Sequence, residues 1–217
     1  MNLENCCIAE RLPAGFVYLH HIDKTIAQEL LFATDGNFVG TPLDKYEGNQ
    51  AICTVKAALA LRQTQRTLKK YHPHWCLQVK DAYRPVSAVE HIKRWAKDLN
   101  DQKSKAKYYP DIDKKDLLGA FVAAKQSPHS RGSTFDVVII NEKTNERLDF
   151  GPNFFGDYAR FDYPHLTPEQ KKNRQFLRKL MIKHGFKPYD GEFWHFVLKD
   201  EPFPKTFFDF KICNAEK

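Results

Sequence analysis

The sequence has little that would place the protein in a membrane or send it out of the cell. No apolar stretch approaches the ~18 residues that a membrane-spanning helix needs. Residues 1–15 contain no apolar run flanked by positive charge, the pattern of a signal peptide. We therefore expect no membrane partner and a cytoplasmic location. A periplasmic or exported location is the alternative should a signal peptide precede Met1.

Cysteine is scarce and is not spaced for a thiolate site. The sequence has 5 cysteines, an odd number, and none of them stands in a Cys-x-x-Cys pair. This spacing argues against a thiolate zinc site and against a redox pair. The adjacent Cys6 and Cys7 cannot readily bridge each other. We predict reduced thiols, as in a cytoplasmic protein, at Cys6, Cys7, Cys53, Cys76 and Cys213.

Several catalytic motifs are also missing. The sequence has neither the His-Glu-x-x-His helix of many zinc peptidases nor the Pro-Cys-x-x-Cys of nucleobase deaminases. It lacks the Gly-x-Ser-x-Gly turn of serine hydrolases and the Gly-Lys-Ser/Thr loop that binds nucleotide phosphates. Any active site must therefore use another arrangement of residues.

Composition and charge indicate a packed globular protein. The 217 residues are 42% hydrophobic and 13% aromatic, enough for one sizeable core. The net charge of +7 comes from 34 basic and 27 acidic residues that are mixed along the chain. Because no long basic run occurs, we expect no nucleic-acid partner. With no internal repeat and no linker, residues 1–217 are predicted to form a single domain.

Hydrophobic periodicity predicts helices and short strands in uneven alternation. Thr167 at a helix start, followed by Pro168 and Gln170, has the spacing of a strong N-terminal cap, and Gly185 is placed to end that helix. Together these elements indicate an α+β fold with a mainly antiparallel central sheet flanked by helices. We predict strands at 16–19, 75–81 (half-buried), 135–140 and 193–198, helices at 50–70, 87–99 (Ser87 opening a capping box), 117–125 and 167–185, and a surface loop at 100–115.

Two separated motifs carry residues that a divalent metal could use. His129 and Asp136 lie in the first motif, 127–136, and His195 lies in the second, 192–195. A lone histidine is more often structural than a ligand. Asp136, however, opens an apolar strand, where an unpaired carboxylate is costly. Two histidines and one carboxylate, with the fourth position left to water, are typical of a catalytic zinc site.

Glu192 and Arg84 complete the candidate site. On one regular strand, Glu192 and His195 would point to opposite faces, so we expect Glu192 in the turn after Asp190-Gly191, leaning over the metal. A glutamate there is typical of the proton carrier in metal-assisted hydrolysis. Arg84 follows a strand and precedes a helix, a position that suits a functional side chain. The other seven histidines are read as surface residues.

These motifs resemble those of the VanX-type D-alanyl-D-alanine dipeptidases, zinc peptidases of the hedgehog/D,D-peptidase fold. The resemblance rests on Asp81-Ala82-Tyr83-Arg84-Pro85, on Ser127-x-His129-Ser130-Arg131-Gly132-Ser133-x-x-Asp136, and on Glu192-x-Trp194-His195. It extends from about Gly15 to Leu198.

The resemblance implies one zinc ion per chain, held by His129, Asp136 and His195. It further implies that Glu192 is the general base and acid, that Arg84 steadies the substrate and the oxyanion, and that Ser127 helps to hold the substrate's carboxylate. The substrate would be a small D,D-dipeptide of peptidoglycan metabolism. The alternatives are a carboxypeptidase or endopeptidase acting on longer cell-wall peptides, and a non-catalytic, zinc-stabilised binding module. The oligomeric state is left open.

One position departs from the family pattern. An aspartate that commonly follows the phenylalanine of Gly-x-x-Phe-Asp, and helps to hold the dipeptide's ammonium group, is replaced by Phe155. Asp157 or Asp149 could substitute for it. If neither does, the preference for a free N-terminus should weaken, and longer peptides become possible substrates.

Overall fold

The computed structural model describes residues 11–122, 125–151 and 156–215, and a six-stranded sheet organises them. Its main path has the order β2-β4-β5-β8-β7, with β6 paired to β5. The β2–β4 pair is parallel and the other pairs of this sheet are antiparallel, which confirms the predicted α+β class and mainly antiparallel sheet. The strands are β2 (Ala27–Gln28), β4 (Trp75–Asp81), β5 (Thr134–Asn141), β6 (Glu146–Arg147), β7 (Phe186–Tyr189) and β8 (Glu192–Leu198).

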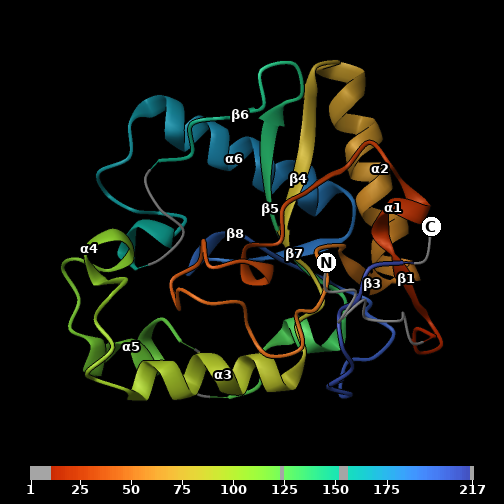
Figure 1. The fold of residues 1–217 in the computed structure, drawn as a ribbon. Coiled ribbons are helices and arrows are strands. Elements are labelled where there is room, and N and C mark those ends of the chain that lie inside the picture. Colours follow the sequence, from red (N-terminus) through yellow and green to blue (C-terminus); the bar gives the residue numbers. More distant parts are fainter. Residues whose placement is uncertain (1–10, 123–124, 152–155, 216–217) are drawn as a thin grey trace, which may run out of the picture.

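Helices surround this sheet, and a small antiparallel ribbon of β1 (Phe16–Tyr18) and β3 (Ile52–Thr54) lies beside it. Figure 1 shows α6 crossing behind β4 and β5, α2 standing next to them, and α3 along the lower edge. The α-helices are α1 (Leu19–Ile22), α2 (Val55–Tyr71), α3 (Val86–Lys97), α4 (Lys105–Tyr108), α5 (Leu117–Ala120) and α6 (Pro168–Lys183). Short 3-10 turns are η1 (Leu31–Ala33), η2 (Lys114–Asp116), η3 (Pro128–Arg131) and η4 (Asp157–Ala159).

The ends of α6 follow the local sequence as predicted. The Thr167 hydroxyl accepts from the backbone N–H of Gln170, and the Gln170 side chain accepts from the backbone N–H of Thr167. This capping box satisfies two N–H groups that a helix start leaves unpaired. Gly185 follows the helix with a φ of +90°, the left-handed conformation that glycine adopts at little cost.

The predicted helix at 50–70 begins too early. Ile52–Thr54 pairs with β1, and the Thr54 side chain then caps α2 by accepting from the backbone N–H of Ala57. Val55 and Leu59, two apolar residues of this stretch, are 39% and 38% exposed. Apolar residues at 52, 55 and 59 fit a helical period, but residue 52 belongs to a strand. The buried face of α2 is therefore rotated away from the face that this spacing predicts.

The Ser87 capping box is not formed. Helix α3 begins at Val86, and the Ser87 backbone N–H and hydroxyl both donate to the Asp209 carboxylate instead. Leu99 lies beyond the end of α3 and is 54% exposed. A partner more than a hundred residues away therefore overrides the local capping signal.

Three further predictions need correction. Strand β4 is buried on both faces from Cys76 to Asp81, not half-buried. Residues 100–115 are not a simple surface loop, because they include α4 and buried Tyr109 and Lys114. In the predicted helix at 117–125, Leu118 and Gly119 have non-helical backbone angles within α5, and residues 123–124 lie outside the described residues.

The cysteine prediction holds for some residues and fails for another. Cys53 and Cys76 are buried free thiols. Cys213 is disulfide-bonded, so the prediction that every thiol is reduced is wrong; Cys6 and Cys7 lie outside the described residues. A disulfide weighs against a reducing compartment, and the cytoplasmic location stays a prediction.

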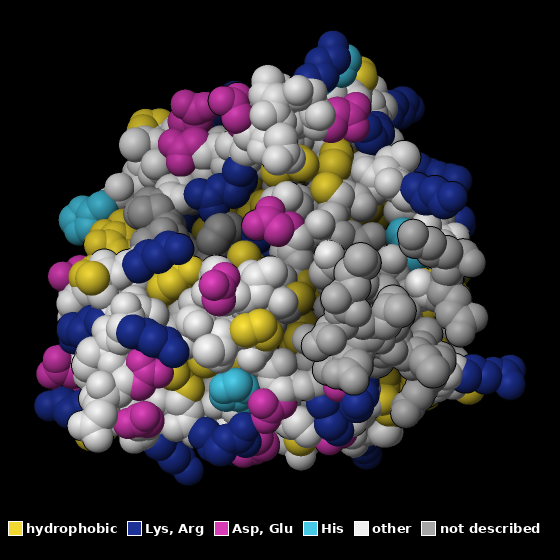
Figure 2. All heavy atoms as spheres, in the orientation of Figure 1, with side chains coloured by type: hydrophobic (Ala, Val, Ile, Leu, Met, Phe, Trp, Pro, Cys, Tyr) yellow, Lys and Arg dark blue, Asp and Glu magenta, His cyan; other side chains and the backbone are white. Residues whose placement is uncertain are grey.

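The surface charge is mixed, as the composition indicates. Figure 2 shows Lys and Arg side chains interspersed with Asp and Glu over the face that it displays. Among the described residues, no helix has both the length and the apolar character to cross a bilayer. The buried hydrophobic residues of the sheet and of α2, α3 and α6 form one core cluster, while the single-domain boundary at 1–217 stays a prediction.

Candidate active site

The turn before β5 places His129 at the end of the sheet. The Ser127 hydroxyl caps η3 by accepting from the backbone N–H of His129 at 3.3 Å. Gly132 then turns the chain with a φ of +78°, and a Cβ atom there would lie 2.2 Å from the Phe16 ring. Only glycine fits such a position. The glycine in the motif is therefore required by both backbone angle and space.

His129, Asp136 and His195 converge as the motifs predict. Asp136 on β5 pairs directly with His195 on β8. Asp136 Oδ1 lies 3.0 Å from His195 Nδ1 and 3.3 Å from His129 Nε2, and the two ring nitrogens are 3.2 Å apart. All three side chains are buried, and the atoms that could bind a metal lie within 4.8 Å of one another. The triad is a candidate site for a metal ion.

The hydrogen bond behind His129 determines which ring nitrogen faces this cluster. His129 Nδ1 lies 2.6 Å from the Ala82 carbonyl oxygen. A carbonyl only accepts, so Nδ1 carries the hydrogen of the neutral ring and Nε2 presents its lone pair to the cluster. Such a partner is typical of metal-binding histidines. Electron-pair donors thus converge on one point, and a cation is the partner that fits.

Glu192 lies beside the triad, although not in the turn that we predicted. It is the first residue of β8, and its Oε2 atom is 3.5 Å from His195 Nδ1. The pairing of β7 with β8 shifts between Pro188 and Tyr189, so that Tyr189 pairs with Glu192. This irregularity places Glu192 and His195, which are three residues apart, on the same side of the sheet. Burial raises the pKa of the Glu192 carboxyl, although His195 opposes the shift.

Arg84 reaches the same site from the connection between β4 and α3. Its Nε and Nη2 atoms donate to Asp81 Oδ2 at 2.8 and 2.7 Å, and Nη2 lies 3.6 Å from Asp136 Oδ2. The guanidinium carbon is 4.5 Å from the centre of the Phe32 ring. Burial alone would lower the pKa of Arg84, but Asp81 and Tyr46 raise it. The side chain therefore stays charged and fixed.

Asp81 is a site residue to which the sequence analysis gave no role. It is 1% exposed, and besides holding Arg84 it accepts from the Tyr46 hydroxyl at 2.7 Å. Its Oδ2 atom is also 3.5 Å from His129 Nδ1. Asp81 thus links Arg84 to the histidine of the triad. Its place three residues before Arg84, at the end of an apolar strand, is the signal that could have identified it.

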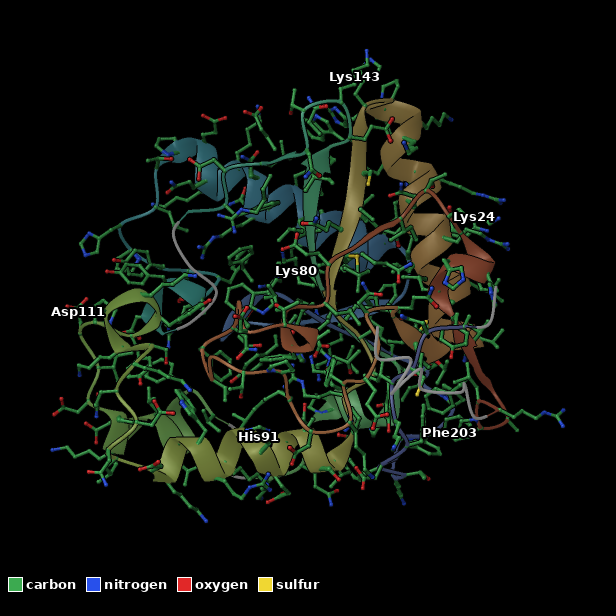
Figure 3. The ribbon with its side chains drawn as sticks, in the orientation of Figure 1. Lys24, Lys80, His91, Asp111, Lys143 and Phe203 are labelled. Atoms are coloured by element: carbon green, nitrogen blue, oxygen red, sulfur yellow. The ribbon has the colours of Figure 1, made fainter. Side chains whose placement is uncertain are left out.

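A β-bulge explains how Asp81 comes to face the site. Val79 pairs with Val137 and Asp81 pairs with Asp136, so Lys80 is an extra residue on β4. One extra residue reverses the side to which the following side chains point. Asp81 therefore shares the face of Asp136, and Lys80 and Asp81 both line the same cavity. Figure 3 places Lys80 near the centre of the molecule, with Lys24 and Lys143 at its edges.

A cavity of about 1110 Å³ joins all the predicted site residues. Its lining includes Ser127, Arg84, Glu192 and the triad, together with Asp157. Asp149 is engaged elsewhere, because its carboxylate accepts from the Gln170 side chain and from the Gly151 backbone N–H. Phe155 lies outside the described residues. Of the two acidic candidates for an ammonium contact, Asp157 is the one that lines the cavity.

The remaining histidines take no part in this site. The prediction that they are surface residues holds for the exposed His21, His74 and His165, whereas His20, His72, His91 and His184 are half-buried.

Comparison with known proteins agrees with this geometry. The Peptidase_M15 model, described as D-ala-D-ala dipeptidase, matches residues 13–213. The chain belongs to this family. The resemblance predicted from three short motifs is therefore confirmed, over a somewhat longer stretch than the predicted 15–198.

The match between this chain and similar D-alanyl-D-alanine dipeptidases covers nearly the whole length of both proteins. D-alanyl-D-alanine dipeptidase of Enterococcus faecalis is 38% identical over 91% of this chain and 98% of its own. Those of Enterococcus faecium and Streptomyces coelicolor are each 32% identical, over 93% of this chain and 100% of theirs. A solved structure of a mutant of the vancomycin resistance D,D-pentapeptidase VanY, in complex with Zn(II), has 16% identity and a TM-score of 0.41. The match covers 70% of this chain and 75% of that one.

Proposed function

We propose that this protein is a zinc-dependent dipeptidase that hydrolyses D-alanyl-D-alanine, or a closely related D,D-dipeptide, in peptidoglycan metabolism. The observation that carries the proposal is the convergence of His129, Asp136 and His195 beside Glu192 in one cavity. Membership of the Peptidase_M15 family and the names of its similar members support the same activity.

The donor set suits one zinc ion per chain. Two imidazole nitrogens and one carboxylate oxygen are ligands that zinc prefers, and a catalytic site keeps its fourth position open. His129, Asp136 and His195 would hold the ion, and the Ala82 carbonyl would orient the His129 ring. When bound, zinc polarises the scissile carbonyl and lowers the pKa of a water molecule to about 7.

Glu192 is proposed to transfer the proton, and Arg84 is proposed to stabilise the developing negative charge. The Glu192 carboxylate accepts a proton from the attacking water and returns it to the amine nitrogen as the peptide C–N bond breaks. Arg84 stabilises the negative charge that develops on the carbonyl oxygen, and its bonds to Asp81 hold it in place before the substrate arrives. Because Asp81 already holds Arg84, little rearrangement of the guanidinium is needed when the substrate binds.

Ser127 and Asp157 are proposed to recognise the two ends of the substrate. Ser127 is buried, lines the cavity and would donate to the terminal carboxylate. Asp157 also lines the cavity and is exposed to solvent, so it would accept from the free ammonium group. A hydroxyl donor for the carboxylate and a negative charge for the ammonium group match the two ends of a zwitterionic dipeptide.

If Asp157 binds the ammonium group, its replacement should weaken binding of the free dipeptide but not of the N-acetylated dipeptide. Asp157→Asn removes the charge but keeps the size, so KM for D-alanyl-D-alanine should rise about tenfold. KM for the N-acetylated dipeptide, which has no ammonium group, should change less than about threefold. Steady-state kinetics on both substrates measures the ratio. Equal changes for the two substrates would show that Asp157 does not contact the ammonium group.

A second candidate is hydrolysis of longer cell-wall peptides. The cavity volume of about 1110 Å³ exceeds the roughly 300–1,000 Å³ typical of pockets for drug-sized ligands. A non-catalytic, zinc-stabilised binding module is disfavoured, since such a protein would need neither Glu192 nor Arg84 in the cavity.

A substrate panel tests the proposed function. Zinc-loaded protein is incubated with D-alanyl-D-alanine, with D,L- and L,L-dipeptides of alanine, and with a muropeptide, and its metal content is measured on the same sample. We expect release of D-alanine from the D,D-dipeptide and at least about a hundredfold lower kcat/KM for the others. Preferential cleavage of the muropeptide would favour the second candidate. Zinc binding without any hydrolysis would favour the binding module.

A further inference from the structure

Arg174 on α6 is one of the most deeply buried charged residues among those described, with 1% of its surface exposed. Its three donor nitrogens all bind backbone carbonyls of one segment. Nε donates to Phe150 at 2.7 Å, Nη2 to Tyr158 at 2.9 Å and Nη1 to Arg160 at 2.5 Å. A single guanidinium therefore joins both ends of the segment 150–160 to the helix.

This guanidinium is charged at neutral pH and is held in place by its neighbours. Its carbon lies 4.0 Å from the centre of the Phe193 ring, the residue next to Glu192. Burial lowers the pKa of Arg174 to about 10, so the side chain is protonated at neutral pH. A planar fork can donate in three directions at once, whereas a lysine ammonium cannot reproduce that geometry.

Residues 156–160, whose backbone Arg174 holds, form one wall of the active-site cavity. Gly156, Asp157, Ala159 and Arg160 line the cavity, and two of the three carbonyl acceptors lie at positions 158 and 160. Two side chains of α6, those of Gln170 and Asn173, make three more hydrogen bonds to Asp149, just before the segment. The position of this wall is thus set by α6, and most directly by Arg174.

We propose that Arg174 is a positioning residue for substrate binding, which holds the cavity wall at residues 156–160 against α6. The proposal rests on the proposed function, because the wall matters only if the cavity binds a dipeptide. Arg174 itself does not line the cavity. It acts through the backbone of the residues that do, and the expected signature is a change in substrate affinity rather than in the chemical step.

The experiment compares Arg174→Met and Arg174→Lys with the wild-type protein, each loaded with zinc. Methionine keeps the apolar stem and removes every donor, while lysine keeps the charge but places its three N–H donors on a single atom. We expect KM for D-alanyl-D-alanine to rise at least about tenfold in Arg174→Met and to an intermediate value in Arg174→Lys. In both variants kcat should stay within about threefold of wild type, and zinc content should be unchanged. The Kd for a phosphinate analogue of the dipeptide should rise in parallel with KM.

Leu180→Ala is the matched control for a merely structural effect. Leu180 is a buried residue of the same helix, so its truncation destabilises the fold, and its side chain has no donor that could bind the carbonyl groups of the segment. A structural effect lowers the amount of active enzyme, which lowers the apparent kcat and leaves KM and Kd unchanged. A lower apparent kcat with unchanged KM and Kd in Arg174→Lys or Arg174→Met would overturn the proposal. A wild-type KM and Kd in either variant would also overturn it.

The binding measurement separates this proposal from the proposed function. Wild-type protein that binds the analogue but hydrolyses nothing refutes the proposed function alone, and the ratio of the Kd values of variant and wild type still decides the role of Arg174. If the wild-type protein does not bind the analogue, both fail.

Discussion

Replacing Glu192 with glutamine is expected to lower kcat for D-alanyl-D-alanine by about 10²–10⁴-fold, the usual contribution of a general base. Glutamine has the same shape but cannot accept a proton from water at neutral pH. Glu192 lies beside the triad without belonging to it, so zinc content should stay at the wild-type level. Loss of turnover with retained metal is therefore the expected combination.

Kinetics and metal analysis on one protein preparation measure both parts of this expectation. Glu201→Gln is a matched control, because Glu201 lines the same cavity but is paired with Arg131 rather than with the triad. Its kcat should stay within about threefold of wild type, since the change removes no group with an assigned role in the reaction. Full activity in Glu192→Gln would remove Glu192 from the mechanism.

Arg84→Gln is expected to lower kcat by about 10²–10³-fold, the usual cost of removing one oxyanion donor. Glutamine retains an amide N–H that can donate to Asp81, so that buried carboxylate keeps a partner and the protein should still fold. A thermal unfolding curve and zinc content are measured alongside the kinetics. The change is expected in turnover rather than in the amount of folded protein.

Arg131→Gln provides the comparison for Arg84. Arg131 lines the same cavity and is paired with Glu201 at 2.9 Å, but its charge is not directed at Asp136. The kcat of Arg131→Gln should change by less than about threefold, since Arg131 has no assigned role in the reaction. If Arg84→Gln instead unfolds the protein, or keeps wild-type turnover, then Arg84 is a structural residue and its assigned role is wrong.

The parts of the site that the sequence predicted are those with an unusual side chain in its local context. Asp136 within an apolar strand and His195 between aromatic residues are costly unless they are paired, and that cost is visible without a structure. Asp81 was not given a role because its direction depends on the bulge at Lys80. Alternation assigns side chains to faces only when the pairing register is known, and the register is a property of two strands.

Arg174 could not have been found from the sequence for a different reason. Its partners are backbone carbonyls, which almost every residue offers, so nothing in the side chains of 150–160 marks them as acceptors. On a helix with many basic residues, an arginine is read as part of the solvated face. The Ser87 capping box failed in a similar way, because Asp209 provides a competing acceptor from a remote part of the chain.

The direct pairing of Asp136 with His195 across β5 and β8 has a consequence for biosynthesis. A ribosome releases the N-terminal part of a chain first, so His129 and Asp136 emerge well before the strand that completes the set. The three candidate ligands can come together only after β8 has docked on β5. Formation of the complete candidate metal site therefore depends on the docking of β8, and a chain that stops before His195 lacks one of the three candidate ligands.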